Sequence, residues 1–280
     1  MWDERISINK AVILAIMAIV SSLLGNRCDF RKESEVAMTD ESKTIIELLN
    51  CDYELIPFKK NQTQILSHFD ALAKQGIAEG FYPLIIMPSV TIAEALEYFK
   101  ENNDIENTPE SIEKARQTVI EKANEIDAKA LLAAQLNEEL DDNNSIIGQF
   151  VRARPQNDLS LDTLGIEPYE EIIIAKIPTK NPWELAAWIP MGGFNECPVP
   201  EEQVAVFRHW FEKYGAVPAV VSYDTWQMTL AKPPLSDEEA EALAKEQFAF
   251  CPDIVFQGTD TIRALASTVK NSPAWFFWWD

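Results

Sequence analysis

Residues 274–280, Ala-Trp-Phe-Phe-Trp-Trp-Asp, restrict the fold of this chain more than any other segment. In a β-strand, successive side chains point to opposite faces of the sheet, so this segment has large apolar groups on both faces. Strands of that kind are typical of sheet interiors that helices cover on both sides. We therefore expect the N-terminal half to pack over, or to extend, the sheet containing this strand, giving one composite body. If the second face is open to solvent, it becomes the predicted partner site.

The composition supports a packed core and argues against some partners. The chain has 280 residues, of which 47% are hydrophobic, and a formal net charge of −21. Such acidity repels phosphate backbones and anionic lipids, and the sequence has no compensating cluster of Lys and Arg. Nucleic acid is therefore not expected as a partner. A basic protein, a cation or a neutral small molecule fits the charge, although the acidity can also serve solubility alone.

The segment 11–25 is uncharged and apolar, followed by a polar stretch up to residue 43. It resembles a signal sequence or a short anchor with a tether behind it. A helix of that length reaches only about 22 Å, short of the ~30 Å hydrocarbon core. The leader before it also carries acids, and Cys28 lacks the small neighbours of a lipidation site. Export or membrane tethering through residues 11–25 and a buried helix in a cytoplasmic protein both remain open.

Short apolar runs alternate with helical patterns along the rest of the chain. Strands are predicted at 53–58, 82–88 and 171–178, and helices at 61–76, 89–103, 200–215 and 236–250, with Ser89 and Ser236 as N-caps. This alternation predicts the α/β class, with α+β as the alternative, and a mixed sheet flanked by helices.

A long helix is predicted at about 108–140, capped by Thr108 and carrying a narrow, alanine-rich apolar stripe. It can serve as a partner-binding arm or lie on its own sheet. The polar stretch behind it divides the chain. The predicted regions are 1–43 (apolar segment and tether), 44–150 (N-terminal α/β region) and 166–280 (C-terminal domain).

The C-terminal domain has its own predicted order of elements. From a strand at 183–190, the order is strand, helix, two strands, two helices and the terminal strand. This is the split βαβ, ferredoxin-like order with one additional helix.

Four stretches of this domain resemble a known family. They are 188-WIPMGGFNECPVPEE-202, 209-HWFEKYGA-216, 249-AFCPDIVFQG-258 and the terminal WFFWWD. Together they resemble the bacterial family of domain of unknown function 4253 (DUF4253), over about the last hundred residues. The resemblance implies a bacterial protein with this domain at its C-terminal end. It implies no activity, so function has to be argued from the residues.

The loop 191-MGGFNECP-198 stands between a predicted strand and a helix, where α/β proteins often bind phosphate. It lacks both the dinucleotide fingerprint and the Lys-Ser/Thr of a nucleotide-binding loop. Glu201 and Glu202 already occupy the positive end of the following helix. Gly192 and Gly193 are therefore expected to form a tight turn with positive φ angles.

Thiol chemistry or a metal site is the alternative function. Cys197 and Cys251 each precede a proline, and His209 follows the first of them on the next helix. A Cys-His nucleophile would use this histidine as base, and Asp253 would complete a set of zinc ligands. The acidic neighbours of both cysteines oppose thiolate formation, and the spacing matches no short metal motif. No metal and no cofactor are predicted.

Seven of the eight tryptophans lie between Trp183 and Trp279. Rigid aromatic residues serve either as core or as recognition surface. The leading hypothesis is a non-catalytic protein-binding module with a partner that can be basic, such as an acidic immunity-type protein that neutralises a basic toxin. The candidate binding residues are Trp188, Gly192, Gly193, Asn195, Trp210, Trp226 and Gln257.

Overall fold

The computed structural model describes residues 38–280, except 59–61, 143, 157 and 162–169. Residues 38–280 form one compact unit. The apolar segment 11–25 and Cys28 lie outside the described residues. None of the helices in the described part has the length and apolar character required to cross a bilayer.

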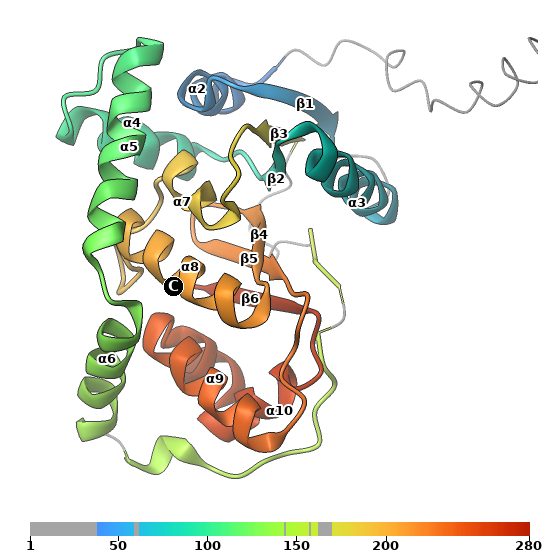
Figure 1. Ribbon diagram of the computed structural model, residues 1–280, viewed down its shortest axis with the longest axis vertical. Coiled ribbons are helices and arrows are strands. Elements are labelled where there is room, and N and C mark those ends of the chain that lie inside the picture. The colour runs from blue at the N-terminus through green and yellow to red at the C-terminus, as the bar shows by residue number, and fades with distance from the viewer. Residues whose placement is uncertain (1–37, 59–61, 143, 157, 162–169) are drawn as a thin grey trace, which may run out of the picture. The chain divides into compact units, whose positions relative to one another are not determined.

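Six strands of the described residues form one mixed sheet in the order β1-β3-β2-β4-β5-β6 (Figure 1). β2 and β4 pair in parallel, and every other neighbouring pair is antiparallel. The strands are β1 (Asp52–Pro57), β2 (Tyr82–Ile86), β3 (Glu171–Ile177), β4 (Val217–Val221), β5 (Thr225–Thr229) and β6 (Ala274–Trp278).

Three helices, α4, α5 and α9, begin at the polar caps that the sequence predicts. Ser89, Thr108 and Ser236 each accept a hydrogen bond from a backbone N–H in the first turn that follows. The helices are α2 (Asp40–Leu49), α3 (Gln62–Glu79), α4 (Val90–Asn102), α5 (Pro109–Glu125), α6 (Ala128–Asp142), α7 (Leu185–Trp188), α8 (Pro200–Tyr214), α9 (Asp237–Phe250) and α10 (Ile262–Val269). Short 3-10 turns lie at Asn144–Ile147 and Pro182–Glu184, and a π-helix at Ile254–Thr259.

Two hydrophobic cores lie on opposite faces of the sheet. The smaller core places Ile65 and Phe69 of α3 against strand residues such as Ile174. The larger core contains residues of α2 and of α4 to α10. Its centre is aromatic, because the Trp210 ring stacks on Phe277 with centroids 5.2 Å apart. The predicted α/β class, with a mixed sheet flanked by helices, is confirmed.

The strand order of the C-terminal part differs from the split βαβ order. That order requires its first two strands to run parallel to each other. The corresponding strands, β3 and β4, run antiparallel, because β2 lies between them and pairs antiparallel with one and parallel with the other. The N-terminal half thus extends the C-terminal sheet, which confirms the predicted composite body for the described residues.

Residues 183–190, predicted as a strand, form the end of a 3-10 turn and α7 instead. The Leu-Ala-Ala run within them favours helix over strand. The side chain of Glu184 also accepts a hydrogen bond of 2.8 Å from Asn181 Nδ2, which fixes the turn at the start of the segment. The first strand of the C-terminal part is therefore β3.

The helix predicted at about 108–140 is two helices. α5 ends at Glu125, and Ile126 has an extended backbone with φ −87° and ψ 123°. Asp127 then caps α6, because its Oδ1 accepts hydrogen bonds from the N–H groups of Lys129 and Ala130, at 3.0 and 3.2 Å. The apolar stripe continues through the break, so periodicity alone does not reveal it.

The terminal strand is an edge strand. Trp275, Phe277 and Trp279 are buried in the larger core, whereas Phe276 and Trp278 on the other face are half-buried. The expectation of an interior strand covered on both faces is therefore wrong. Among the described residues, the helix that contributes to the smaller core is α3, which packs over the opposite half of the sheet and leaves this part of the second face partly open.

Replacing Asp127 with alanine is expected to lower the free energy of unfolding by about 1 kcal/mol, because α6 loses its N-cap. Urea denaturation of the purified protein measures this change. Glu125→Ala is the matched control, since Glu125 is an exposed carboxylate two residues away. Equal effects of the two substitutions would contradict a capping role.

Candidate functional site

The loop of residues 190–199, called the glycine loop below, joins α7 to α8. Gly192 and Gly193 have φ angles of 118° and 76°. A Cβ atom on Gly192 would lie 2.1 Å from the carbonyl oxygen of Pro198, so this position has no room for a side chain. The predicted tight turn with positive φ angles is confirmed.

The buried side chain of Gln203, on α8, supports the glycine loop through hydrogen bonds. Its Nε2 donates hydrogen bonds to the carbonyl oxygens of Met191 (2.8 Å) and Pro198 (2.7 Å). Its Oε1 accepts a hydrogen bond of 2.7 Å from Trp226 Nε1. Gln203 was not among the predicted site residues. The signal for it was a polar residue among the apolar positions of the helix that follows the loop.

The two candidate cysteines are buried, and their thiols have low reactivity. Cys251 Sγ donates to the carbonyl oxygen of Trp278 at 3.0 Å, and Cys197 Sγ lies 3.8 Å from Met191 Sδ. Burial raises the pKa of the Cys251 thiol to about 12. Burial also raises the pKa of Cys197, and the nearby Cys251 and Asp224 side chains raise it further. Both thiols are therefore protonated at neutral pH, which disfavours a nucleophilic role.

His209 does not join the cysteines. It lies on the side of α8 that faces α9, with Nε2 3.3 Å from Glu246 Oε2. His209 lies nine positions after Pro200, the first residue of α8, which corresponds to about 13 Å along the helix, whereas Cys197 precedes the helix. Within the described ranges, no group of three or more His, Cys, Asp and Glu side chains is arranged to hold a metal ion.

Glu246 organises the contact between α8 and α9. Its carboxylate accepts hydrogen bonds from Trp210 Nε1 at 3.0 Å and from Lys213 Nζ at 2.9 Å. Burial raises the pKa of Glu246, but the nearby His209 and the hydrogen bond from Lys213 outweigh it, so the net pKa lies below its ordinary value. This cluster joins two helices and leaves His209 beside a carboxylate, with 9% of its side chain exposed.

Three other predicted site residues converge at Asp280. Asp253 Oδ2 accepts the backbone N–H of Asp280 at 3.0 Å, and its Oδ1 accepts Gln257 Nε2 at 3.0 Å. Gln257 Nε2 also lies 3.2 Å from Asp280 Oδ2, and Asn195 Nδ2 donates to the backbone oxygen of Asp280. These contacts tie the glycine loop and the π-helix to the end of β6.

The tryptophans predicted to bind a partner belong to the core. Trp210 and Trp226 have no exposed surface. Trp188 is buried as well, and the guanidinium carbon of Arg116 lies 3.3 Å from the centre of its ring. Among the tryptophans of the described part, Trp183 and Trp278 are half-buried and the others are buried. Direct contact with a partner therefore does not pass through Trp188, Trp210 or Trp226.

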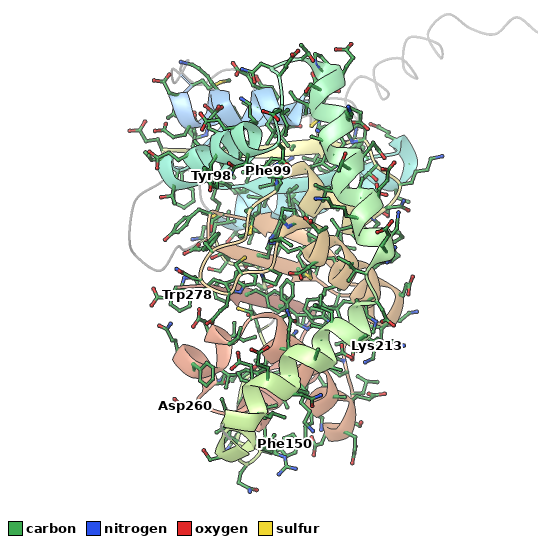
Figure 2. All side chains as sticks on the ribbon, turned by 90° about the vertical axis from the view of Figure 1, so that its left-hand side faces the viewer. Tyr98, Phe99, Phe150, Lys213, Asp260 and Trp278 are labelled. Carbon is green, nitrogen blue, oxygen red and sulfur yellow. The ribbon has the colours of Figure 1, made fainter. Side chains whose placement is uncertain are left out.

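A cleft of about 770 Å³ lies between α4, α5 and the glycine loop. Gly192, Gly193 and Phe194 line one wall, and Tyr98 and Phe99 of α4 line another. Tyr98 is 66% exposed, although it is a large aromatic residue. Figure 2 shows Tyr98 and Phe99 close together in the upper half of the molecule. The cleft is thus the place where predicted binding residues face solvent next to exposed aromatic surface.

The charged residues around the cleft are mixed. Glu94, Asp104 and Glu201 lie in its lining together with Lys114 and Lys122. Lys122 Nζ is 3.3 Å from Glu201 Oε1, so one lysine already has an acidic partner.

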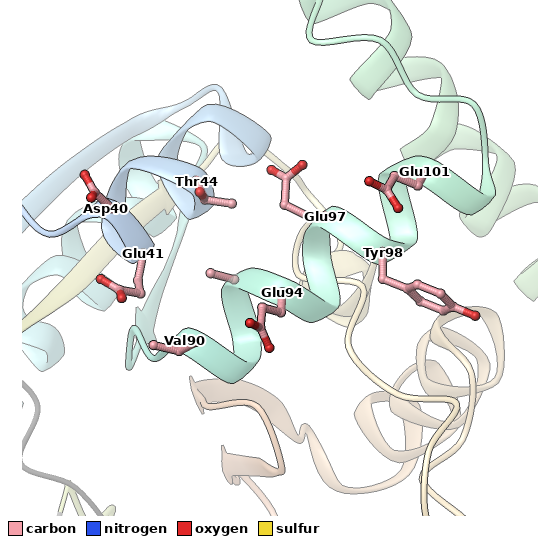
Figure 3. A pocket seen from close by; sticks show the side chains of 9 residues that line it. Asp40, Glu41, Thr44, Val90, Glu94, Glu97, Tyr98 and Glu101 are labelled. Atoms are coloured by element: carbon pink, nitrogen blue, oxygen red, sulfur yellow. The ribbon is translucent and has the colours of Figure 1, made fainter.

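A second hollow, of about 570 Å³, adjoins the cleft between α2 and α4. It shares Glu94 and Tyr98 with the cleft, and its lining contains no Lys or Arg. Figure 3 shows Tyr98 projecting from α4 away from α2, while Glu97 lies on the side near Thr44. Its acidic lining residues are Asp40, Glu41, Glu94, Glu97 and Glu101.

The glycine loop, α8 and the contacts of Asp280 all lie in one segment of the chain that matches a known family. Residues 173–280 match the DUF4253 family, a domain of unknown function. No curated protein and no solved structure matches the chain. The DUF4253 region supplies the glycine loop, whereas α4 and α5 lie outside the match. The cleft is therefore formed jointly by the DUF4253 region and the N-terminal half.

We predict that Cys197 and Cys251 resist alkylation in the folded protein. Iodoacetamide at neutral pH is expected to modify them at least about a hundredfold more slowly than in urea-unfolded protein, because the reactive thiolate is suppressed and the sulfur atoms are buried. Mass spectrometry of the cysteine peptides measures each site separately. Rapid modification of Cys197 in folded protein would instead favour the enzymatic alternative.

Glu246→Gln is expected to lower the free energy of unfolding by about 1–2 kcal/mol at neutral pH, because the half-buried carboxylate loses its charge-assisted hydrogen bonds from Trp210 and Lys213. The folded-state pKa of Glu246 is depressed, so its contribution is present above its ordinary pKa of about 4.5 and is lost as the pH falls through the folded-state value. The difference between wild type and variant should therefore shrink in acid. Urea denaturation over a pH series tests this.

Glu212→Gln is the control for this variant, because it removes the same charge from an exposed position on α8. Its effect is expected to stay within about 0.5 kcal/mol. A wild-type advantage over Glu246→Gln that persists unchanged in acid would show that the carboxylate is not the source of the stability.

Proposed function

We propose that the protein is a non-catalytic binding module that holds a basic segment of another protein in the cleft between α4, α5 and the glycine loop. The cleft itself is the observation that carries this proposal. It combines solvent access, exposed aromatic surface and a backbone wall without side chains at Gly192 and Gly193.

The residues of α4 suit a cationic side chain. Glu94, Tyr98 and Glu101 are spaced by four and three residues, so they form one stripe along the helix. All three are exposed. The methylene stem of a bound Lys or Arg can lie along the Tyr98 ring, with its charge between the two carboxylates. A cation over an aromatic face contributes about 0.5–1 kcal/mol at an exposed site and more where water is excluded.

Electrostatics also favours a basic partner. The chain has a net charge of −21, and the hollow beside the cleft has a lining with five carboxylates and no Lys or Arg. Two of these carboxylates already have lysine partners, Asp40 with Lys43 and Glu97 with Lys100, so Glu41, Glu94 and Glu101 contribute most to the local field. Such a field speeds the approach of a basic protein and repels acidic ones.

The enzymatic alternative lacks comparable support. A Cys-His mechanism needs a thiolate and an imidazole within hydrogen-bonding reach. Here the thiols have raised pKa values, and His209 lies beside Glu246 of α9 instead, with Nε2 3.3 Å from Oε2.

Selection from a displayed library of random short peptides tests the proposed function. Wild type is expected to enrich peptides that carry Lys or Arg beside an aromatic or aliphatic residue. Tyr98→Ala should weaken the best of these peptides about tenfold in calorimetry, since the stacking surface is lost. Tyr53→Ala is the matched control, because Tyr53 is an exposed tyrosine, 38% accessible, on β1 outside the cleft.

A charge series completes this test. Glu94→Gln and Glu101→Gln should each weaken binding and reduce its dependence on salt. Glu47→Gln is the control, because Glu47 is an exposed residue of α2 that lines neither the cleft nor the hollow, and its replacement should leave binding unchanged. Enrichment of acidic peptides, or binding that Tyr98→Ala leaves unchanged, would refute the proposed site.

A further inference from the structure

We infer that Gln203 is a positioning residue that sets the glycine-loop wall of the cleft, and that Trp226 holds Gln203 in place. This inference rests on the proposed function of the cleft and adds to it the buried device that shapes the binding surface. Neither residue lines the cleft, so both would act through the loop.

The hydrogen bonds of Gln203 bridge the two ends of the loop. Met191 and Pro198 are seven positions apart, and both of their carbonyl oxygens accept from the same amide nitrogen. Each of the two N–H groups of that amide has one acceptor, so its donor capacity is fully used. The bridge therefore fixes how far apart the ends of the loop stand, and with that the position of Gly192, Gly193 and Phe194.

Trp226 determines which way the amide of Gln203 points. An indole N–H can only donate, so it requires the amide oxygen, and the amide nitrogen must then face the two carbonyl groups. The reversed amide would set two donors against each other and an acceptor against two acceptors. Trp226 is itself held by packing, with its ring 5.5 Å from that of Phe207 in an edge-to-face arrangement. The loop is thus tied to β5 through a buried hydrogen-bond network, which is rigid.

Gly192 shows that the loop and the glutamine fit each other closely. A Cβ atom at this position would lie 2.5 Å from Gln203 Nε2. The side chain absent at Gly192 leaves the room that the amide occupies. An apolar residue would fill the same volume in the core, but it would leave two carbonyl groups and one indole N–H unpaired. The polar residue at this buried position is therefore explained by the loop it holds.

Hydrogen–deuterium exchange of the full chain tests this inference independently of any ligand. The loop has two internal backbone hydrogen bonds, from Gly193 N–H to Cys197 and from Cys197 N–H to Phe194. In Gln203→Leu, exchange of these two amides is expected to rise about tenfold, whereas amides of β4 and β5 keep their wild-type rates. Trp226→Phe, which removes only the indole donor, should give a smaller increase at the same two amides.

Gln247→Leu is the matched control. Gln247 is another buried glutamine, on α9, and its Nε2 has no hydrogen-bond partner among the described residues. Its replacement should leave exchange of the loop amides unchanged. If Gln203→Leu does not fold, Trp226→Phe against Gln247→Leu decides the question by the same measurement.

Peptide binding then separates this inference from the proposed function. The selected peptide should bind Gln203→Leu about tenfold more weakly than it binds wild type or Gln247→Leu. Unchanged exchange of the loop amides in the Gln203 and Trp226 variants would overturn the positioning role, whatever the peptide does. Faster loop exchange with unchanged peptide affinity would overturn it as well, because the loop would then not shape the binding surface. Failure of wild type to bind any peptide would refute the proposed function, while the exchange rates still decide the role of Gln203.

Discussion

The parallel pairing of β2 with β4 is the contact on which the rest of the structure depends. It joins the β1-β3-β2 half of the sheet to the β4-β5-β6 half through Ile85 opposite Val220 and Ile86 opposite Val221. Met87 extends the pairing, because its N–H donates to the Val221 carbonyl oxygen at 3.0 Å. The two faces of this short junction contribute to the two hydrophobic cores, so burial on both sides reinforces a small number of hydrogen bonds. Since α4 follows β2 directly, the same pairing brings Tyr98 opposite the glycine loop.

The tryptophans and the histidine that the sequence offered as candidate site residues mainly stabilise the fold. Two central tryptophans, Trp210 and Trp226, need acceptors for their indole N–H groups once they are buried, and Glu246 and Gln203 supply them. His209 lies against the same glutamate. The indole N–H groups of these two tryptophans are thus buried with partners, whereas those of Trp275 and Trp279 have none among the described residues. What reaches solvent from this arrangement is the glycine loop rather than the tryptophans.

The proposed binding surface combines two regions, which has consequences for the DUF4253 region. Residues 173–280 supply Gly192, Gly193 and Phe194, but the aromatic and acidic residues of the opposite wall come from α4. The aromatic and acidic residues of α4 in the N-terminal half would then select the partner, while the DUF4253 region would provide a loop of fixed shape. This division agrees with a loop whose geometry is set internally by Gln203 and Trp226, with no contribution from α4 or α5 among the hydrogen bonds described.

Much of the fold could be predicted from local pattern. The caps at Ser89, Thr108 and Ser236, the positive φ angles of Gly192 and Gly193 and the mixed sheet all follow from short-range rules about side-chain hydrogen bonds, backbone sterics and hydrophobic period. Where prediction failed, the local signal was ambiguous or absent. A continuous apolar stripe concealed the break at Asp127, and strand order cannot be derived from the order of elements along the chain.

The candidate site shows the same limit. Sequence alone determined that Gly192 and Gly193 make a tight turn, since that depends on their own backbone freedom. It also determined that the chain is acidic and rich in buried-type aromatic residues. Only the tertiary structure decided that Trp188, Trp210 and Trp226 are core, that His209 and Cys197 are apart, and that Tyr98 faces the loop. Those outcomes depend on the insertion of β2 between β3 and β4, which brings together residues more than a hundred positions apart in the chain. Long-range pairing of this kind is set by the total burial of both faces of the sheet, and no single stretch of sequence contains it.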